Sequence, residues 1–330
     1  MDILNNPYIT YDCIRTSVVA SDKEKDDFCV EFGDILFQRS SETLEDVGRA
    51  NVYLDSRPAL FGGFTIRGKK KGNYNPLFFK YLLDSPAARK RVIVKGAGAQ
   101  HFNIGQEGLS KVTLSFPSLA EQSKISILLS TLDKRIAIQN KLIQRYESLI
   151  KAITKNLVTN GTKLFQLQDI AEIYQPKTIT ANILSVDGEY PVYGANGIIG
   201  KYNQYNHANP QICLTCRGNT CGTINYSLPY SWITGNSMVI NVDKYPDSAN
   251  KRYLYHLLST IDFTPYISGS GQPQIVRSTL KKLPIYLPDI PHQIKVASVL
   301  DTMIEKREIE KGLQNLLVQR KKVLLRSMFI

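Results

Sequence analysis

Long apolar runs, a leader-like start and an even set of cysteines are all missing from this sequence. No stretch of 18 apolar residues occurs, so no transmembrane helix is expected. Residues 1–6 contain neither a basic cluster nor an apolar core, so we expect no signal peptide. The five cysteines are odd in number and unevenly spaced, which favours free thiols in a reducing cytoplasm. These absences predict a cytoplasmic protein without a membrane partner.

The sequence also lacks a recognisable set of catalytic residues. Its four histidines are scattered, and no Ser/His/Asp, Cys/His or paired-carboxylate spacing stands out. The segment from Gly63 to Lys70 has the spacing of a phosphate-binding loop, but Lys70 stands where a magnesium-binding Ser or Thr is required. Cys213, Cys216 and Cys221 have no fourth ligand at zinc-site spacing. We therefore expect a noncatalytic chain without a metal.

The sequence is long and basic. Its 330 residues suggest about two domains, and a hydrophobic fraction of 43% is enough to bury real cores. The formal net charge of +12 favours a polyanionic partner such as nucleic acid. Composition alone does not distinguish a protein with a nucleic-acid partner from a soluble basic protein without one.

An internal duplication organises the chain. The Pro-x-x-x-x-Gln segment 117–122 matches 288–293 at an offset of 171, and the match continues without a gap to Lys151 and Lys322. Farther upstream the offset drifts, to 175 for residues 77–83 against 252–258 and to 178 for Arg39 against Arg217. Small insertions in surface loops explain such a drift. The sequence therefore predicts two similar units.

Each unit is expected to end in a long helix. From Ile125 to Leu157, ten positions spaced alternately four and three apart are apolar except for Gln139, a pattern typical of a coiled-coil seam. Gln139 either fixes the register or extends its amide toward solvent. The second helix is less regular, because Arg307, Glu310 and Gln314 fall at seam positions. A stutter near Lys306 predicts that the seam resumes in a shifted frame at Ile309, Leu313, Leu316 and Val323. Pairing of the two helices within the chain is the simplest way to bury both seams.

The segments before the helices are predicted to be irregular α+β domains. Short runs rich in β-formers alternate with Gly, Asn, Asp and Pro, which is typical of short strands and turns. One short helix recurs in both units, near residues 77–83 and 253–259. Strands are expected at 35–37, 59–61, 64–66, 190–193, 212–214 and 238–240.

The order of these features resembles the specificity subunits of type I restriction-modification systems. The resemblance covers nearly the whole chain and rests on the two Pro-x-x-x-x-Gln helices together with four segments: residues 167–170 (LQDI), 190–200 (YPVYGANGIIG), 217–222 (RGNTCG) and 269–275 (GSGQPQI). It implies an α+β fold of two duplicated irregular α/β target-recognition domains separated by an antiparallel two-helix coiled coil. The implied parts are a first recognition domain (1–116), a first spacer helix (117–158), a second recognition domain (159–287) and a second spacer helix (288–330).

The same resemblance implies a function and partners. Each recognition domain would read one half of a bipartite sequence in double-stranded DNA. Methylation subunits would dock on the helices, and an endonuclease or translocase subunit would join the complex. S-adenosylmethionine, ATP and magnesium would belong to those partner subunits, so no cofactor is expected in this chain.

Basic residues and polar loop residues are the candidate DNA contacts, since cations hold phosphates and polar side chains read base edges. A solvated charge run or a plain structural turn is the alternative for each of them. The candidates are Lys69, Lys70, Lys71, Gln100 and His101 in the first unit, and Lys201, Arg217, Gln272 and Gln274 in the second. The candidate spacer and partner interface comprises Ile125, Leu129, Leu132, Ile136, Ile143, Ile150, Leu300 and Leu313.

One departure from a symmetrical repeat stands out. The second unit has a Leu-x-Asp-Ile opening whose first-unit counterpart would lie before residue 1, so the first unit is expected to lack about 20 residues at its start. This leaves open a truncated or silent variant that assembles but reads DNA poorly. A coiled-coil adaptor without a DNA role is the remaining alternative.

Overall fold

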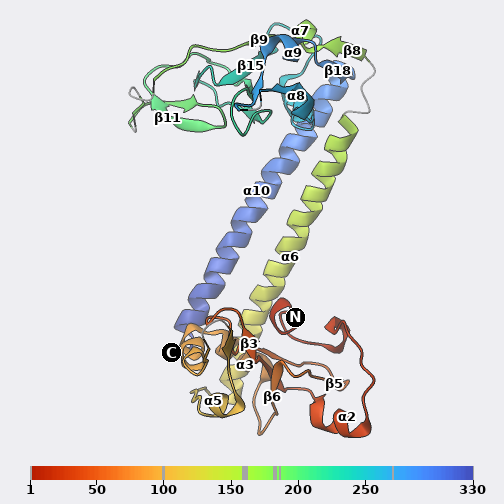
Figure 1. Cartoon of the computed structure of the whole chain (residues 1–330), viewed down its shortest axis with the longest axis vertical. Coiled ribbons are helices and arrows are strands. Elements are labelled where there is room, and N and C mark those ends of the chain that lie inside the picture. Colours follow the sequence, from red (N-terminus) through yellow and green to blue (C-terminus); the bar gives the residue numbers. More distant parts are fainter. Residues whose placement is uncertain are drawn as a thin grey trace. The chain divides into compact units, whose positions relative to one another are not determined.

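The computed structural model describes residues 2–98, 101–157, 163–180, 184–185, 187–269 and 271–329. It divides into two units, which we call the first unit (residues 1–142 with 310–330) and the second unit (residues 143–309). Each unit contains one globular part together with portions of two long helices, α6 (Leu119–Leu157) and α10 (Ile290–Ser327) (Figure 1). No helix in the described ranges is apolar enough over its length to cross a membrane.

The globular part of the first unit is built around a three-stranded antiparallel sheet. Its order is β4 (Ala50–Val52), β2 (Ile35–Gln38), β6 (Thr65–Gly68), and Ile35 lies opposite both Val52 and Gly68. Two smaller pairs join β1 (Cys29–Val30) to β5 (Ala59–Leu60) and β3 (Ser40–Ser41) to β7 (Phe102–Asn103). The helices are α1 (Asp2–Asn5), η1 (Tyr11–Cys13), α2 (Asp22–Phe28), α3 (Pro76–Asp84), α4 (Pro86–Ile93) and α5 (Gln106–Ser110).

The second unit contains a larger set of strands. A four-stranded sheet has the order β13 (Ile224–Tyr226), β12 (Ile212–Thr215), β15 (Ser237–Asn241), β9 (Glu172–Tyr174). A second sheet has the order β11 (Ile198–Tyr202), β10 (Tyr190–Tyr193), β14 (Trp232–Ile233). Two further pairs join β8 (Lys163–Gln166) to β18 (Pro284–Leu287) and β16 (Ile267–Ser268) to β17 (Gln274–Ile275). The helices are α7 (Leu167–Ile170), α8 (Lys251–Leu258), η3 (Thr264–Tyr266) and α9 (Arg277–Lys281).

The duplication predicted from the sequence is present in the structure. β2, β4 and β6 of the first unit pair in the same antiparallel order as β12, β13 and β15 of the second. One pairing predicted from the sequence is wrong by one residue. Ser40, and not Arg39, takes the place of Arg217, because Ser40 lies opposite Asn103 as Arg217 lies opposite Gln274. The offset at this point is therefore 217 − 40 = 177, one less than the 178 that pairs Arg39 with Arg217.

The Pro-x-x-x-x-Gln segments form the same joint in both units. Helices α3 and α8 each begin at an asparagine, Asn75 or Asn250, whose side chain accepts a hydrogen bond from a backbone N–H of the first turn. The backbone N–H of Asn75 donates to Oε1 of Gln122 at 3.0 Å, and Gln122 Nε2 donates to the Pro117 carbonyl at 2.9 Å. In the second unit Gln293 makes both bonds, to Asn250 and Pro288, at 2.8 Å. A buried glutamine thus ties each short helix to the start of a long one.

Apolar side chains complete each joint. In the first unit Phe78 and Tyr81 of α3 pack in one cluster with Ile125 and Leu129 of α6 and with Phe329. The second unit has the corresponding cluster, in which α8 packs against the start of α10 and the last turns of α6. Its members there include Tyr253, Leu254, Leu257, Ala297, Leu300, Ile150, Ile153 and Leu157.

The two long helices run antiparallel where they meet in the first unit. Asp133 of α6 forms an ion pair with Lys321 of α10 at 2.5 Å, and Gln139 of α6 bonds Glu310 of α10. The residue numbers of the α10 partners fall as those of α6 rise, which is the pattern of an antiparallel pair. The amide of Gln139 donates to both the backbone carbonyl and the carboxylate of Glu310. Of the two readings of Gln139, the structure therefore supports a register contact, because the side chain is buried against α10.

The predicted stutter in α10 is wrong. Polar residues continue the original seam, because Glu310 bonds Gln139 and Gln314 Nε2 donates to Asn140 Oδ1. The apolar residues of the shifted frame point outward and are all exposed. They are Ile309, Leu313, Leu316 and Val323. The physical reason is that paired amide, carboxylate and ammonium groups satisfy one another across this part of the seam, so apolar side chains are not required there.

Candidate nucleic-acid interface

In the second unit, two segments predicted to contact DNA lie side by side. Arg217 pairs with Gln274 across a short antiparallel bridge, the Gly218 N–H donates to the Pro273 carbonyl at 3.0 Å, and the Ile275 N–H donates to the Cys216 carbonyl at 3.1 Å. The side chains of Arg217 and Gln274 are exposed. The edge of the unit at this point therefore presents a cation beside an amide.

The turn that leads to Gln274 requires glycine. Gly269 has a φ of +89°, and a Cβ there would come within 2.7 Å of the Gln272 carbonyl oxygen. The resulting tight turn, between β16 and β17, carries Gln272 on its exposed side. The sequence prediction placed Arg217, Gln272 and Gln274 in two separate loops, and the structure brings these loops together.

The first unit has an equivalent hairpin. Ser40 lies opposite Asn103 and bonds its side chain, and the Ile104 N–H donates to the Arg39 carbonyl at 2.9 Å. Gly98, with a φ of +141°, opens the turn as Gly269 does in the second unit. His101 is exposed in this hairpin. Gln100, the other candidate of this loop, lies outside the described residues.

The lysine run of the first unit lies elsewhere. Lys69, Lys70 and Lys71 follow Gly68, which pairs with Ile35 at the start of β2, whereas His101 belongs to the hairpin beyond the end of β2. Five residue steps separate Ile35 from Ser40, which corresponds to about 16 Å in an extended chain. Lys69 and Lys71 are exposed. The structure therefore does not bring the lysine run and His101 together.

Lys70 has a structural environment of its own. Its backbone N–H donates to Asp34 Oδ1 at 2.8 Å. Its Nζ lies 5.7 Å from the centre of the Phe32 ring and 5.4 Å from that of Tyr74, so the ammonium group makes cation–π contacts. Lys201, the remaining basic candidate, is exposed on β11, whose sheet is separate from that of β12.

Two residues at the hairpin end of β2 were missed as candidates. Arg39 is exposed, its Nη1 donates to the Gly63 carbonyl at 3.5 Å, and its backbone N–H donates to the Phe64 carbonyl at 2.9 Å. Phe64 is 78% exposed, which is unusual for a phenylalanine. The positive charge of Arg39 was the available signal for this position in the sequence. Arg39 and Phe64 thus lie at the same end of β2 as His101.

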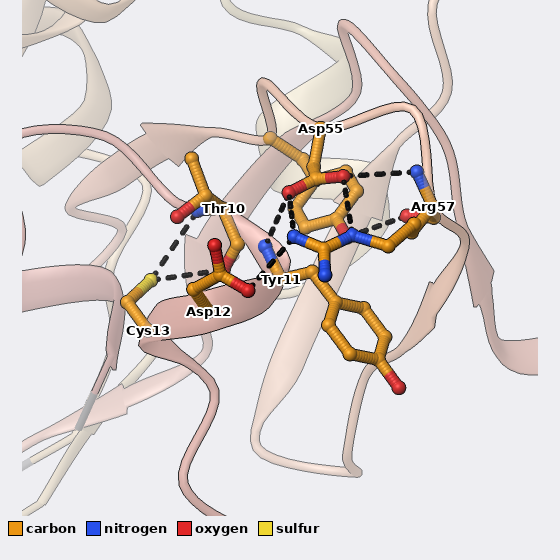
Figure 2. A network of polar contacts seen from close by, with 7 residues as sticks. Thr10, Tyr11, Asp12, Cys13, Asp55 and Arg57 are labelled. Atoms are coloured by element: carbon orange, nitrogen blue, oxygen red, sulfur yellow. Dashed lines mark hydrogen bonds and ion pairs between the residues drawn. The ribbon is translucent and has the colours of Figure 1, made fainter.

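Arg57 is an exposed arginine with a different role. Figure 2 shows its guanidinium between Asp12 and Asp55 and beside the Tyr11 ring. Arg57 Nη2 lies 2.8 Å from Asp12 Oδ1 and 2.9 Å from Asp55 Oδ2, and its Cζ is 4.5 Å from the ring centre. Hydrogen bonds from Arg57 hold the pKa of Asp55 well below its usual range. These contacts tie two loops together. Because two carboxylates already neutralise the Arg57 guanidinium, it is a poor phosphate ligand.

The cysteines of the second unit lie in two different apolar clusters. Cys213 packs with Tyr193, Ile233 and Val239, whereas Cys216 belongs to the main core. Burial raises the pKa of the Cys213 thiol to about 12, which disfavours the thiolate that a metal would need.

Comparison with known proteins identifies the class to which this repeated architecture belongs. The sequence model of the type I restriction modification DNA specificity domain matches the chain twice, at residues 3–148 and 160–319. The chain therefore belongs to this family.

Relatives of known description agree with this assignment. A type I restriction enzyme specificity subunit of Haemophilus influenzae is 27% identical over 160 residues, which cover 44% of this chain and 40% of that protein. One of Escherichia coli is 28% identical over 112 residues, 34% of this chain and 27% of the relative. The matched region thus spans less than half the length of these relatives.

A solved structure shares the fold. The S subunit of a type I restriction-modification system from M. genitalium superposes with a TM-score of 0.62 at 17% identity, covering 92% of this chain and 85% of that one. The fold class predicted from the sequence, two recognition domains and an antiparallel pair of helices, is confirmed.

Proposed function

We propose that this chain is a noncatalytic, sequence-specific DNA-binding subunit of a type I restriction-modification complex. In this proposal each globular part reads one half of a bipartite target in double-stranded DNA. The parts are residues 1–116 and 159–287, and the helical segments 117–158 and 288–330 separate them. Methylation subunits and an endonuclease or translocase subunit complete the assembly.

The observation that carries the proposal is the pair of equivalent hairpins. Each is bridged to the residues that follow β2 or β12, each turns at a glycine with positive φ, and each presents exposed polar or basic side chains. Arginine pairs with guanine and glutamine with adenine through two hydrogen bonds in the major groove. Arg217 and Gln274 have the chemistry for such contacts, and the net charge of +12 favours the phosphate backbone.

The outward face of α10 supports a protein partner for the helices. Leu313, Leu316 and Val323 are exposed at coiled-coil spacing, and Leu316 is 64% exposed. Such a stripe favours docking of partner helices. The experiment compares Leu316→Asp with Ile136→Asp, which alters the partly buried seam of α6. Leu316→Asp is expected to abolish methylase binding while the chain stays folded, whereas Ile136→Asp should weaken both; full binding by both variants would contradict the docking.

Co-expression of this chain with a methylation subunit tests the proposal as a whole. The expected result is a stable complex and adenine methylation at one bipartite motif. Absence of both would contradict the proposal. A coiled-coil adaptor without a DNA role would instead show interactions that do not depend on salt, whereas phosphate binding weakens steeply as salt rises.

A second candidate function is a variant that assembles but reads DNA poorly. The observation that favours it is that, among the residues that the structure describes, β6 pairs only with β2, whereas β15 of the second unit also pairs with β9. Tight, site-specific DNA binding by the 330-residue chain would exclude this candidate.

A further inference from the structure

In the second unit, the turn between β10 and β11 is held against the end of β12. We call residues 194–197 the β10–β11 turn. Thr215 Oγ1 donates to the Ala195 carbonyl, and Ser237 Oγ donates to the carbonyls of Gly194 and Ala195 at 2.7 and 3.3 Å. Thr215 and Ser237 lie opposite each other on β12 and β15, and both are buried. These bonds give the turn a fixed position on one face of the main sheet.

The same face of the main sheet carries Arg217. Successive side chains of a strand point to opposite faces. Cys213 packs with side chains of the β10 sheet, whereas Cys216 belongs to the main core on the other face. Thr215 and Arg217 therefore lie on the face of Cys213, and two residue steps between them correspond to about 7 Å in an extended chain. The β10–β11 turn thus borders the site formed by Arg217 and Gln274.

The tip of the β10–β11 turn presents an oriented amide. Asn225 Nδ2, on β13, donates to Asn196 Oδ1 at 3.0 Å, and the side chain of Asn196 is exposed. An amide has two lone pairs on its oxygen and two hydrogens on its nitrogen. Within the described residues, the bond from Asn225 leaves the second lone pair of Oδ1 and the Nδ2 hydrogens of Asn196 for a ligand.

The glycines that follow Asn196 and Arg217 leave room for a ligand. Gly197 has a φ of +98° and Gly218 a φ of +87°, so the backbone conformation favours glycine at both positions. A Cβ at either position would meet no described atom within 4 Å. The Asn196 and Arg217 side chains therefore extend from turns whose adjacent glycines do not obstruct the approach of a base edge.

We propose that Asn196 is a further base-reading residue and selects an A·T pair in the half-site of the second unit. This inference rests on the proposed function, because it assigns a base to the same site. In the major groove adenine presents an N6–H donor and the N7 acceptor, and asparagine pairs with both. The remaining lone pair of Asn196 Oδ1 accepts from N6–H, and Nδ2 donates to N7. Asn225 is the positioning residue that holds the amide in this orientation.

Geometry and chemistry both restrict the base. Guanine presents acceptors at both N7 and O6, so an amide oriented by Asn225 would place its oxygen against the O6 acceptor. Neighbouring bases of one DNA strand are about 3.4 Å apart, so the step of about 7 Å from Thr215 to Arg217 corresponds to about two bases. Asn196 and Arg217 therefore contact the same half-site.

Methylation mapping tests the assignment in complexes of the full chain with a methylation subunit. In Asn196→Ala, one A·T pair of the half-site that Arg217→Ala also alters should accept any base pair. Asn225→Ala should relax the same pair to a smaller extent. The matched control is Asn203→Ala, an exposed asparagine directly after β11 at the other end of the hairpin, which should leave the motif unchanged. An unchanged motif in Asn196→Ala, or relaxation at a G·C pair, would overturn the proposal.

A duplex with 7-deazaadenine at the assigned position tests the N7 bond directly. Fluorescence anisotropy should show that the wild-type complex binds this duplex about tenfold more weakly than the unmodified duplex. The Asn196→Ala complex should bind both duplexes equally. Equal binding of both duplexes by the wild type would overturn the proposal. So would a phosphate contact, in which Asn196→Ala weakens binding to the motif and to an unrelated duplex alike.

The outcomes separate this proposal from the proposed function. A wild-type complex without a methylated motif would contradict the proposed function and the role of Asn196 with it. A wild-type motif that Asn196→Ala leaves intact would contradict the role of Asn196 alone. If Asn196→Ala does not assemble, the 7-deazaadenine comparison still decides, because it uses the wild-type chain.

Discussion

The first and second units share a joint and a hairpin but differ in how completely their cores are covered. Gln122 and Gln293 make the same two hydrogen bonds, and Gly98 and Gly269 open equivalent turns. In contrast, the second core is covered by residues 163–174, and the first contains an apolar cavity at the equivalent place. Polar contacts that fix geometry thus agree between the repeats, while apolar burial differs.

The largest expected effect separates the two cores. Leu280→Ala removes a completely buried side chain and should lower the free energy of unfolding of the second unit by about 3 kcal/mol. Leu109→Ala, at the equivalent and partly exposed position, should cost the first unit about 1 kcal/mol. Urea unfolding followed by Trp232, the single tryptophan, reports on the second unit, and hydrogen exchange reports on the first. Equal losses would contradict the difference in burial.

A smaller effect should be the same in both units. Gln122→Ala and Gln293→Ala each remove two hydrogen bonds from a buried joint, so each should destabilise its own unit by about 2 kcal/mol. Hydrogen-exchange rates of the backbone amides in α3 and α8 measure the two losses of stability. Gln144→Ala, at an exposed position on α6, is the control and should have almost no effect. A difference of more than about 1 kcal/mol between the two joints would show that they are not equivalent.

The polar seam of the first unit can be tested by a double-mutant cycle. Gln139→Ala and Glu310→Ala should each destabilise the first unit, and the pair should show a coupling energy of about 1 kcal/mol, because each side chain is the other's partner. Chemical denaturation of the wild type, both single variants and the double variant gives this value. Strict additivity would argue against the observed register.

The smallest expected effect is a loss of stability of the second unit at acidic pH. His256 of the second unit donates to Asp301 at 2.7 Å, and Tyr81 stands at its place in the first unit and donates to Asp133 at 2.8 Å. Burial lowers the pKa of His256 despite the opposing effect of Asp301. His256 therefore binds a proton more readily in the unfolded chain than in the folded chain. Its contribution to the free energy of unfolding is constant above about pH 6.5 and falls as the pH drops below that value.

This loss should appear in the second unit and be absent in His256→Tyr between about pH 6.5 and 5. Burial raises the pKa of Tyr81, whose ionisation therefore lies far above this range. Thermal unfolding across this pH range checks the expectation. An equal acid loss in both units would contradict the assignment to His256.

Much of the fold was predictable because its signals are local. The expected strands and short helices all lie within or overlap observed elements, since β-forming runs and capping asparagines act over a few residues. The repeat also showed that Gln122 and Gln293 are equivalent positions at the starts of the two long helices, although it did not predict their bonds to Asn75 and Asn250. It paired Arg39 with Arg217, although the strand register displaces this equivalence by one residue, to Ser40.

The failures have a common physical cause. A search for apolar spacing cannot recognise a seam made by Gln139, Glu310 and Lys321, whose partners lie far away in the sequence. Likewise, the sequence does not show that Lys69 to Lys71 and His101 lie at opposite ends of β2, because that depends on strand register. The cavity beside Leu114 was also not predictable, since it depends on what covers it.

The most direct test of DNA recognition is to map methylated adenines for complexes that contain the wild-type chain or Arg217→Ala/Gln274→Ala. The account predicts one bipartite motif for the wild type. In the variant, bases of one half should become degenerate while the other half and the spacing between them stay unchanged. A motif without two halves, or a variant in which both halves change together, would contradict the assignment of one half-site to each unit.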